Sequence, residues 1–354
     1  MATMWAAMYY GKGDIRLEKI PRPVPGPGEV LMHVHYCGIC GSDARSYQKG
    51  PPPGNFPLPR IMGHEFSGQV AELGPGVQGF HVGERVAAAP ATSCGYCFYC
   101  RRGALTLCLN AKDFGTSHNG AQAEYALVLA RMVEQGGLVA LPDDLTDEKA
   151  ALIEPVGTCY RGLVTRGRLA PGETVVVVGD GAIGLIQVML ARHLGAATVV
   201  CAGHHPDRLE MARRFGAQIT VNTHQDDLKA VVQQATEGMG ADLVMVSVPN
   251  VAAFQQALPT VRGDGRLVVF GGVPRGSTTE FDPNVVHYGE LTVTGSFNCA
   301  VEEFRHVAEI AGSLPLDELI SHRVRLGRII EGYGALASKD GLKVLVDSYD
   351  HGLT

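Results

Sequence analysis

The sequence predicts an α/β protein built around a doubly wound parallel sheet. An unbroken run of four valines, Val175–Val178, is typical of a strand that is covered on both faces. Gly179, Gly181 and Gly184 follow it and open an amphipathic helix pattern. Strand and helix patterns then alternate through the rest of the second half of the chain. A glycine turn between such a strand and helix lets the backbone approach a pyrophosphate, so we expect a dinucleotide site here.

Composition narrows the class of protein. A net charge of −6 without basic clusters argues against binding to nucleic acid. No stretch approaches the roughly 20 apolar residues of a membrane span. The first residues lack a basic region followed by a long apolar core, so no secretory signal is evident. We therefore expect a cytoplasmic location.

The first part of the chain has β character. Met4–Ile20 has the pattern of a hairpin, Pro21–Gly28 is a stiff turn, and Val30–Tyr36 alternates like a half-buried strand. His33 and His35 share one face of that strand without ligand-like neighbours. We interpret them as hydrogen-bonded sheet histidines rather than metal ligands.

Two motifs after that strand indicate a metal site. Cys40 in CGICGSD offers a thiolate and His64 in GHEFSG an imidazole, while Glu65 or another carboxylate could complete a three-ligand zinc site with one open position. Spacing alone does not settle this assignment, and we expect Cys37 to be a packing residue. Glu154 begins a helix, where it either faces the metal or is a first-turn acid favoured by the helix dipole.

A cysteine cluster forms the strongest local signal. Four of the nine cysteines follow the spacing C-x2-C-x2-C-x7-C: Cys94, Cys97, Cys100 and Cys108. Four thiolates close a tetrahedral site without room for water. The spacing predicts a structural zinc site in a reducing compartment rather than a disulfide framework.

The second half of the chain predicts six strands: Val175–Val178, Thr198–Ala202, Ile219–Val221, Leu243–Val248, Arg266–Phe270 and Leu291–Thr294. Helical patterns such as Arg208–Phe215 and Leu228–Ala235 separate most of them. Their carboxyl ends should hold the cofactor largely by backbone, at the point where strand order reverses. The contacts expected there are Gly179, Gly181, Ala182, Ile183, Gly184, Val248, Gly271, Gly272, Val273, Gly295, Ser296 and Phe297. After a helix at Val301–Ala311, we expect the tail to return to the first domain.

Together these motifs resemble the zinc-dependent medium-chain dehydrogenase/reductase family, and more narrowly its sorbitol and polyol dehydrogenase branch. The resemblance covers almost the whole chain, through CGICGSD, GHE, the cysteine cluster, EPVGT at 154–158 and VVVVGDGAIG at 175–184. It implies a GroES-like, β-rich catalytic domain (1–155 and 296–354) interrupted by a Rossmann domain (156–295). It also implies a homodimer or homotetramer.

The resemblance further implies roles for single residues. Cys40, His64 and a glutamate, either Glu65 or Glu154, would bind a catalytic zinc that polarises the oxygen of a secondary alcohol or ketone. Ser42 would pass on the alcohol proton, and Thr158 would contact the nicotinamide side. The implied substrates are polyols, sugar alcohols, cyclitols or hydroxy ketones. Two other interpretations are a zinc-independent quinone or enone reductase of the same fold, and a cofactor-binding protein without catalysis.

Two positions depart from the family pattern. Arg45 stands where many relatives have a relay histidine, and it would contact a phosphate or an anionic substrate, or be solvated. Gly203 stands where NAD-using relatives carry an acid, and His204, His205 and Arg208 follow it. A carboxylate about 4 Å from one phosphate charge is repelled by about 4 kcal/mol at a dielectric constant near 20. Its absence predicts a preference for NADP(H) over NAD(H), unless the histidines form only a polar loop.

Overall fold

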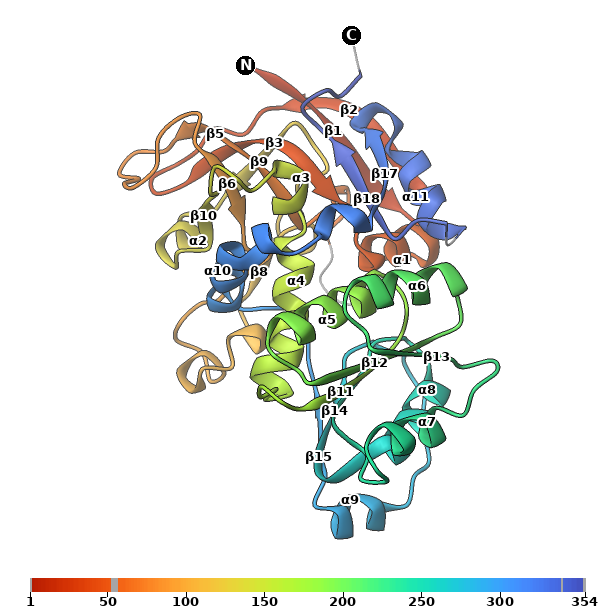
Figure 1. Ribbon diagram of the computed structural model, residues 1–354. Helices are drawn as coiled ribbons and strands as arrows, with labels where there is room; N and C mark the ends of the chain where they lie inside the picture. Colours follow the sequence, from red (N-terminus) through yellow and green to blue (C-terminus); the bar gives the residue numbers. More distant parts are fainter. Residues whose placement is uncertain (1, 52–56, 339, 353–354) are drawn as a thin grey trace. The chain divides into compact units, whose positions relative to one another are not determined.

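The protein is described by a computed structural model that covers residues 2–51, 57–338 and 340–352. The chain forms two compact units, Met1–Gly157 with Cys299–Thr354, and Thr158–Asn298 (Figure 1). Among the described residues, no helix combines the length and apolar character that a bilayer span needs.

The second unit contains a six-stranded parallel sheet in the order β13-β12-β11-β14-β15-β16. This order confirms the predicted doubly wound fold, with its reversal point between β11 and β14. Figure 1 shows α5 (Ala182–His193) and α6 (Pro206–Arg214) on one side of the sheet and α7 (Leu228–Ala235) and α8 (Val251–Ala257) on the other. The strands are β11 (Thr174–Val178), β12 (Thr198–Gly203), β13 (Ile219–Asn222), β14 (Ala241–Val246), β15 (Val261–Val269) and β16 (Thr292–Gly295).

The core of the sheet confirms that the valine run is a buried strand. Val176 is fully buried and packs in one cluster with Val200 and Val244 from the flanking strands. Burying a side chain of this size stabilises the fold by roughly 1.5–3 kcal/mol. The helices of this unit are α5 (Ala182–His193), α6 (Pro206–Arg214), α7 (Leu228–Ala235), α8 (Val251–Ala257) and α9 (Pro283–Gly289), and a π-helical segment, Arg161–Arg166, follows α4.

Two of the predicted strands, β14 and β15, differ from the structure by more than one residue at a boundary. Strand β14 ends at Val246, so Val248 lies in the loop beyond it. Strand β15 begins five residues before Arg266, because Val261 already pairs with Ala241 ahead of a register shift. Asp264 adopts a φ of 58° in that irregular stretch. Its two flanking glycines made the segment read as a loop.

The first unit is rich in β structure. Strands β1 (Thr3–Gly11) and β2 (Asp14–Pro21) form the predicted antiparallel hairpin. A seven-stranded sheet has the order β10-β6-β5-β3-β18-β17, with β9 also paired to β3. Its strands are β3 (Val30–Gly38), β5 (Glu65–Leu73), β6 (Arg85–Ala88), β9 (Tyr125–Val128), β10 (Leu138–Ala140), β17 (Ile320–Arg325) and β18 (Lys343–Asp347).

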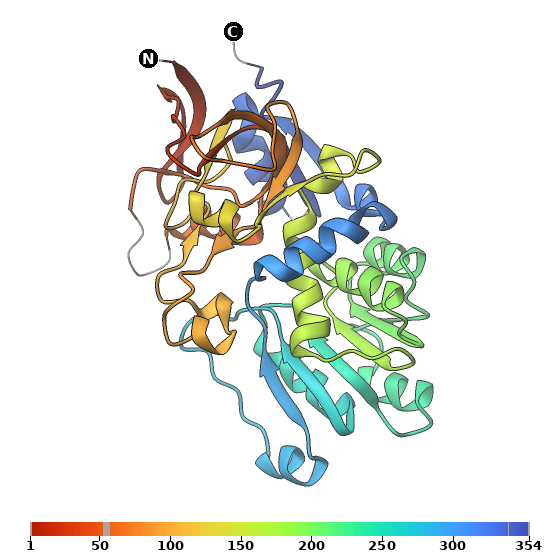
Figure 2. The same ribbon diagram turned by 90° about the vertical axis from the view of Figure 1, so that its left-hand side faces the viewer.

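The C-terminal tail returns to this unit, as predicted. Strand β18 runs antiparallel to β3, with Leu345 opposite Gly38. The blue C-terminal strands accordingly lie beside the red N-terminal ones in Figures 1 and 2. The remaining elements of this unit are β4 (Arg60–Ile61), β7 (Ala91–Thr92), β8 (Lys112–Asp113), α1 (Gly41–Lys49), α2 (Ala130–Glu134), α3 (Asp147–Ala150), α4 (Ile153–Tyr160), α10 (Val301–Ile310) and α11 (Ile329–Ala337).

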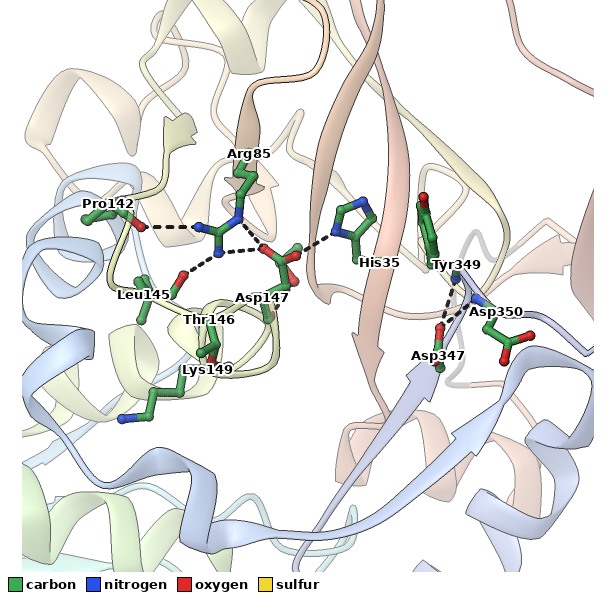
Figure 3. A network of polar contacts seen from close by, with 11 residues as sticks. His35, Arg85, Pro142, Leu145, Thr146, Asp147, Lys149, Asp347, Tyr349 and Asp350 are labelled. Atoms are coloured by element: carbon green, nitrogen blue, oxygen red, sulfur yellow. Dashed lines mark hydrogen bonds and ion pairs between the residues drawn. The ribbon is translucent and has the colours of Figure 1, made fainter.

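A polar network ties α3 to the sheet of the first unit (Figure 3). The His35 Nδ1 lies 2.6 Å from a carboxylate oxygen of Asp147, and the Arg85 Nε donates to the other oxygen at 2.9 Å. His33 instead stacks on Tyr125, with ring centroids 4.8 Å apart. Among the described residues, neither histidine belongs to a group that could hold a metal ion. The His35 ring is hydrogen-bonded through Nδ1, whereas its buried Nε2 has no partner in the described part of the chain.

Replacing Asp147 with asparagine should destabilise the first unit by about 2 kcal/mol at pH 7, since two charged hydrogen bonds weaken. Burial raises the pKa of Asp147, but His35 and Arg85 outweigh this effect and lower it. A lowered carboxyl pKa stabilises the fold above the unfolded value of about 3.9 and loses this effect as the pH falls below it. The difference between variant and wild type should therefore shrink below about pH 4.

This prediction is checked by urea unfolding followed by the fluorescence of Trp5. Trp5 is the chain's single tryptophan and lies on β1 in the first unit. Asp14→Asn is the control, because Asp14 pairs with Arg16 at the surface and should change the free energy of unfolding by less than about 1 kcal/mol. An equally small effect of Asp147→Asn would show that the network does not stabilise the unit.

Candidate metal centres and dinucleotide site

The first unit gathers three of the predicted zinc ligands. Cys40 immediately precedes α1, His64 immediately precedes β5, and Glu65 is the first residue of β5. One ligand atom from each lies within 4.8 Å of the other two. Cys40 and His64 are half-buried and Glu65 is buried. A thiolate, an imidazole and a carboxylate at this separation fit a catalytic zinc site.

Asp43, which the sequence analysis did not single out, supports two of these residues. It is buried, accepts a hydrogen bond from the Cys40 backbone N–H at 3.1 Å, and lies 3.8 Å from the His64 Nδ1. Burial acts to lower the pKa of His64, but Asp43 and Cys40 outweigh it and raise the pKa well above its usual value. A carboxylate behind a metal-binding histidine orients the imidazole ring. The three-residue spacing from Cys40, which is typical of a capping box, is the signal that could have found it.

Glu65 has a charged partner that the sequence did not reveal. The Lys343 ammonium, on the first residue of β18, donates a hydrogen bond to the Glu65 carboxylate. The exposed fractions of the two residues are only 1% and 4%. Burial acts to lower the pKa of Lys343, but Glu65 and Cys40 outweigh it and raise the pKa. A metal that binds Glu65 therefore competes with a buried ammonium group.

Glu154 is the second carboxylate near the site. It lies in the first turn of α4 and is buried, with an exposed fraction of 7%. Its charge contributes to raising the pKa of both His64 and Lys343. It is outside the group whose ligand atoms all lie within 4.8 Å of one another. Both glutamates remain candidate ligands.

The other predicted residues around this centre differ in exposure. Ser42 and Arg45 are both exposed on α1, two and five residues after Cys40. Cys37 is fully buried, and burial raises the pKa of its thiol well above the ordinary value. Cys37 is outside the group of Cys40, His64 and Glu65, in agreement with its expected role as a packing residue.

The four cysteines of the second motif also come together. The ligand atoms of Cys94, Cys97, Cys100 and Cys108 lie within 4.8 Å of one another. The Cys100 Sγ is 3.5 Å from that of Cys97 and 3.9 Å from that of Cys94. Zinc–sulfur bonds of about 2.3 Å give a tetrahedron with edges of about 3.8 Å. The four thiols therefore fit a structural zinc ion.

A cavity of about 280 Å³ lies at the carboxyl ends of β11, β12 and β14 in the second unit. Of the predicted cofactor contacts, Gly179, Gly203, His204 and Val248 line it. Its volume is close to the lower end for small-molecule sites, about 300 Å³. Further lining residues that no sequence motif indicated are Asp180, Thr223, His224, Asn250 and Gln256.

The space beside Gly203 is not free of negative charge. A Cβ atom added at Gly203 would lie 2.4 Å from the Asp180 side chain, so the carboxylate of Asp180 occupies that volume. Asp180 belongs to the glycine turn after β11. The inference that this region lacks a carboxylate was therefore wrong, because an acid distant in the sequence reaches the end of β12. Asp180 is held by the backbone N–H groups of His204 and His205, each at 2.8 Å.

The remaining predicted contacts lie partly in the turns that follow the strands and partly on helices. Gly181 caps α5, and Ala182, Ile183 and Gly184 form its first turn. A Cβ at Gly184 would lie 1.8 Å from the Gly179 carbonyl oxygen, so only glycine permits this close packing. Beyond β15 and β16 lie Gly271, Gly272, Val273, Ser296 and Phe297, with Gly295 ending β16, while Thr158 is half-buried on α4 and Arg208 half-buried on α6.

Two known domain families match this chain. Residues 26–143 match the alcohol dehydrogenase GroES-like domain, and residues 182–313 match the zinc-binding dehydrogenase domain. The chain is 31% identical to L-threonine 3-dehydrogenase from Rhizobium etli, over 98% of this chain and 99% of that protein. It is 32% identical to sorbitol dehydrogenase from Halalkalibacterium halodurans, over 96% and 98%.

A solved structure agrees with these likenesses. A zinc-binding dehydrogenase from Sinorhizobium meliloti, solved bound to NADP, superposes with a TM-score of 0.90 at 30% identity, over 98% of this chain and 100% of that one. These matches cover nearly the whole chain, and the solved structure shares its fold. The chain belongs to the zinc-type medium-chain dehydrogenases of the alcohol dehydrogenase superfamily.

Proposed function

We propose that this dehydrogenase transfers a hydride between NADP(H) and a secondary alcohol or ketone with the help of zinc. The observation that carries the proposal is the cluster of Cys40, His64 and Glu65, whose ligand atoms lie within 4.8 Å of one another. Such a ligand set weighs against the zinc-independent quinone or enone reductase and against a protein without catalysis.

Different residues of the chain would bind the metal, position one of its ligands and transfer the proton. Cys40, His64 and either Glu65 or Glu154 would hold the ion, while Asp43 positions the His64 ring from behind. Zinc, when bound, supplies a Lewis acid for the substrate oxygen, and the nicotinamide accepts or donates the hydride. The exposed hydroxyl of Ser42 would carry the alcohol proton towards solvent. A second zinc ion would be held by the four clustered cysteines as a structural centre.

The preference for NADP(H) is supported by the loop that follows β12. His204, His205 and Arg208 place imidazole and guanidinium donors near the end of that strand, where a 2′-phosphate would bind. The similar Sinorhizobium meliloti protein was solved bound to NADP. The Asp180 carboxylate opposes this preference by its charge, but hydrogen bonds from the histidine loop already occupy it.

The substrate class follows from the relatives. L-Threonine and sorbitol both carry a secondary hydroxyl next to a carbon that bears an amino or hydroxyl group. We propose such vicinal substrates, including polyols, sugar alcohols, cyclitols and hydroxy ketones. We also propose a cytoplasmic enzyme whose catalytic domain comprises 1–155 and 296–354 and whose Rossmann domain comprises 156–295.

The test is a panel assay with NADP and NAD, with L-threonine, sorbitol, other polyols and the corresponding ketones, and with zinc measured on the same sample. We expect oxidation of a vicinal secondary alcohol, higher kcat/KM with NADP, and two zinc ions per chain. Full activity in a zinc-free preparation, or reduction of quinones alone, would contradict the proposal.

A homodimer or homotetramer is supported by the free edge of the parallel sheet. Within the described residues, β16 is the last strand and pairs on one side only, with β15. Val293 on this strand and Tyr288 on the preceding helix have exposed fractions of 39% and 80%. An edge with apolar side chains favours pairing with another chain. Light scattering of the purified enzyme measures its mass in solution.

A further inference from the structure

The Asp180 side chain lies where an acid at the end of β12 would lie, a position at which the sequence has Gly203 instead. Gly203 ends β12 without a side chain, and the Asp180 carboxyl group occupies the volume that a Cβ there would need. Asp180 also lines the cavity together with Gly203 and His204. An acid at the end of this strand binds the hydroxyls of the adenosine ribose in NAD-using folds. A carboxylate is thus present where the choice between a 2′-hydroxyl and a 2′-phosphate is made.

The loop that follows β12 donates hydrogen bonds to the Asp180 carboxylate. Its Oδ2 accepts the backbone N–H groups of His204 and His205, each at 2.8 Å. The His205 ring Nδ1 lies 3.1 Å from Oδ1 and 3.0 Å from Oδ2. Burial raises the pKa of Asp180, but these contacts outweigh it and lower the pKa. The carboxylate therefore stays ionised, and His205 is the side chain that offsets its charge.

Two further imidazoles face the same cavity from separate loops. The His204 ring stacks on that of His224, with centroids 4.7 Å apart and planes at 21°, and its centroid is 4.1 Å from that of His205. His224 follows β13, so only the parallel pairing of β12 and β13 brings it to this point. Both His204 and His224 line the cavity, where imidazole N–H groups can donate to a phosphate.

We propose that Asp180 determines the choice between NADP(H) and NAD(H), and that His205 together with the stacked pair His204 and His224 offsets its charge towards a 2′-phosphate. The proposal rests on the proposed function only in placing the adenosine ribose at this cavity. A free Asp180 carboxylate favours the ribose hydroxyls of NAD(H), and repels a 2′-phosphate. The three histidines shift the preference from NAD(H) towards NADP(H), so the choice of cofactor depends on four side chains from three loops.

Three variants separate these contributions. Asp180→Asn removes the charge but keeps an oxygen for the loop N–H groups, and should shift the KM ratio of the two cofactors towards NADP by roughly tenfold. His205→Asn removes the offsetting imidazole and should shift it towards NAD by a similar factor. His224→Asn should weaken NADP several-fold and leave NAD unchanged. Asp207→Asn is the matched control, because Asp207 is exposed on α6 and lies outside the cavity lining.

Binding is measured apart from activity by calorimetry on the zinc-loaded enzyme, with adenosine 2′,5′-bisphosphate and 5′-AMP as probes. We expect Asp180→Asn to tighten the bisphosphate relative to 5′-AMP by the same factor as the KM ratio. Equal changes for both probes would mean that Asp180 only holds the loop, and an equal effect of Asp207→Asn would mean a general charge effect; either overturns the proposal.

The wild-type preference is a separate result. If the wild-type enzyme prefers NAD, the cofactor part of the proposed function fails. The role of Asp180 still stands if Asp180→Asn shifts the ratio towards NADP. If the wild type prefers NADP and none of the variants changes the ratio, the proposed function survives and the role of Asp180 is wrong.

Discussion

His64→Ala is expected to lower kcat by roughly a thousandfold or more while the Kd for NADPH changes by less than about twofold. The reason is that His64 offers one of the three clustered ligand atoms of the first unit, whereas the dinucleotide cavity is formed within the second unit. Cys40→Ser should behave in the same way. Steady-state assays give kcat, and titration of NADPH fluorescence gives the Kd.

Metal content and a control variant complete this test. Zinc should fall from two ions to one per chain in both variants, because the four-cysteine cluster is untouched. His81→Ala is the matched control, since His81 lies in the same unit with 78% of its side chain exposed, and it should retain wild-type turnover. If His64→Ala kept near-normal turnover, the proposed zinc chemistry would have to be abandoned.

Lys343→Met is expected to have the largest effect on stability. It leaves the Glu65 carboxylate buried without its ammonium partner. Removing one partner of a buried ion pair destabilises a protein by about 3–5 kcal/mol. Urea unfolding followed by Trp5 fluorescence reports on the first unit, to which Glu65, Lys343 and Trp5 all belong.

A double variant shows whether the loss comes from the unpaired charge. Glu65→Gln with Lys343→Met removes both charges and should recover most of the stability, because replacing a whole buried pair is often close to neutral. Lys49→Met, at an exposed site in the last turn of α1, is the control and should change stability by less than about 0.5 kcal/mol. A double variant as unstable as Lys343→Met would point to lost packing rather than to charge.

Local sequence was sufficient wherever the signal depends on near neighbours in the chain. The valine run, the glycine turn and the helix after it are contiguous, so the unbroken apolar run and the helical period of 3.6 residues identify them directly. The cysteine cluster spans only residues 94–108. Its spacing alone predicted a grouping that the structure shows within 4.8 Å.

Charged side chains that meet across neighbouring strands could not be predicted from the local sequence. Lys343 reaches Glu65 from 278 positions along the chain, because β18 pairs with β3 and β3 with β5. Asp180 fills the space beside Gly203, and His224 stacks on His204, because β12 pairs with both β11 and β13. Periodicity encodes which face a residue takes within its own element, whereas strand order and register decide which distant side chain it meets. For this protein the motifs predicted the class of chemistry through their resemblance to a known family, whereas sheet pairing established the charges around each site.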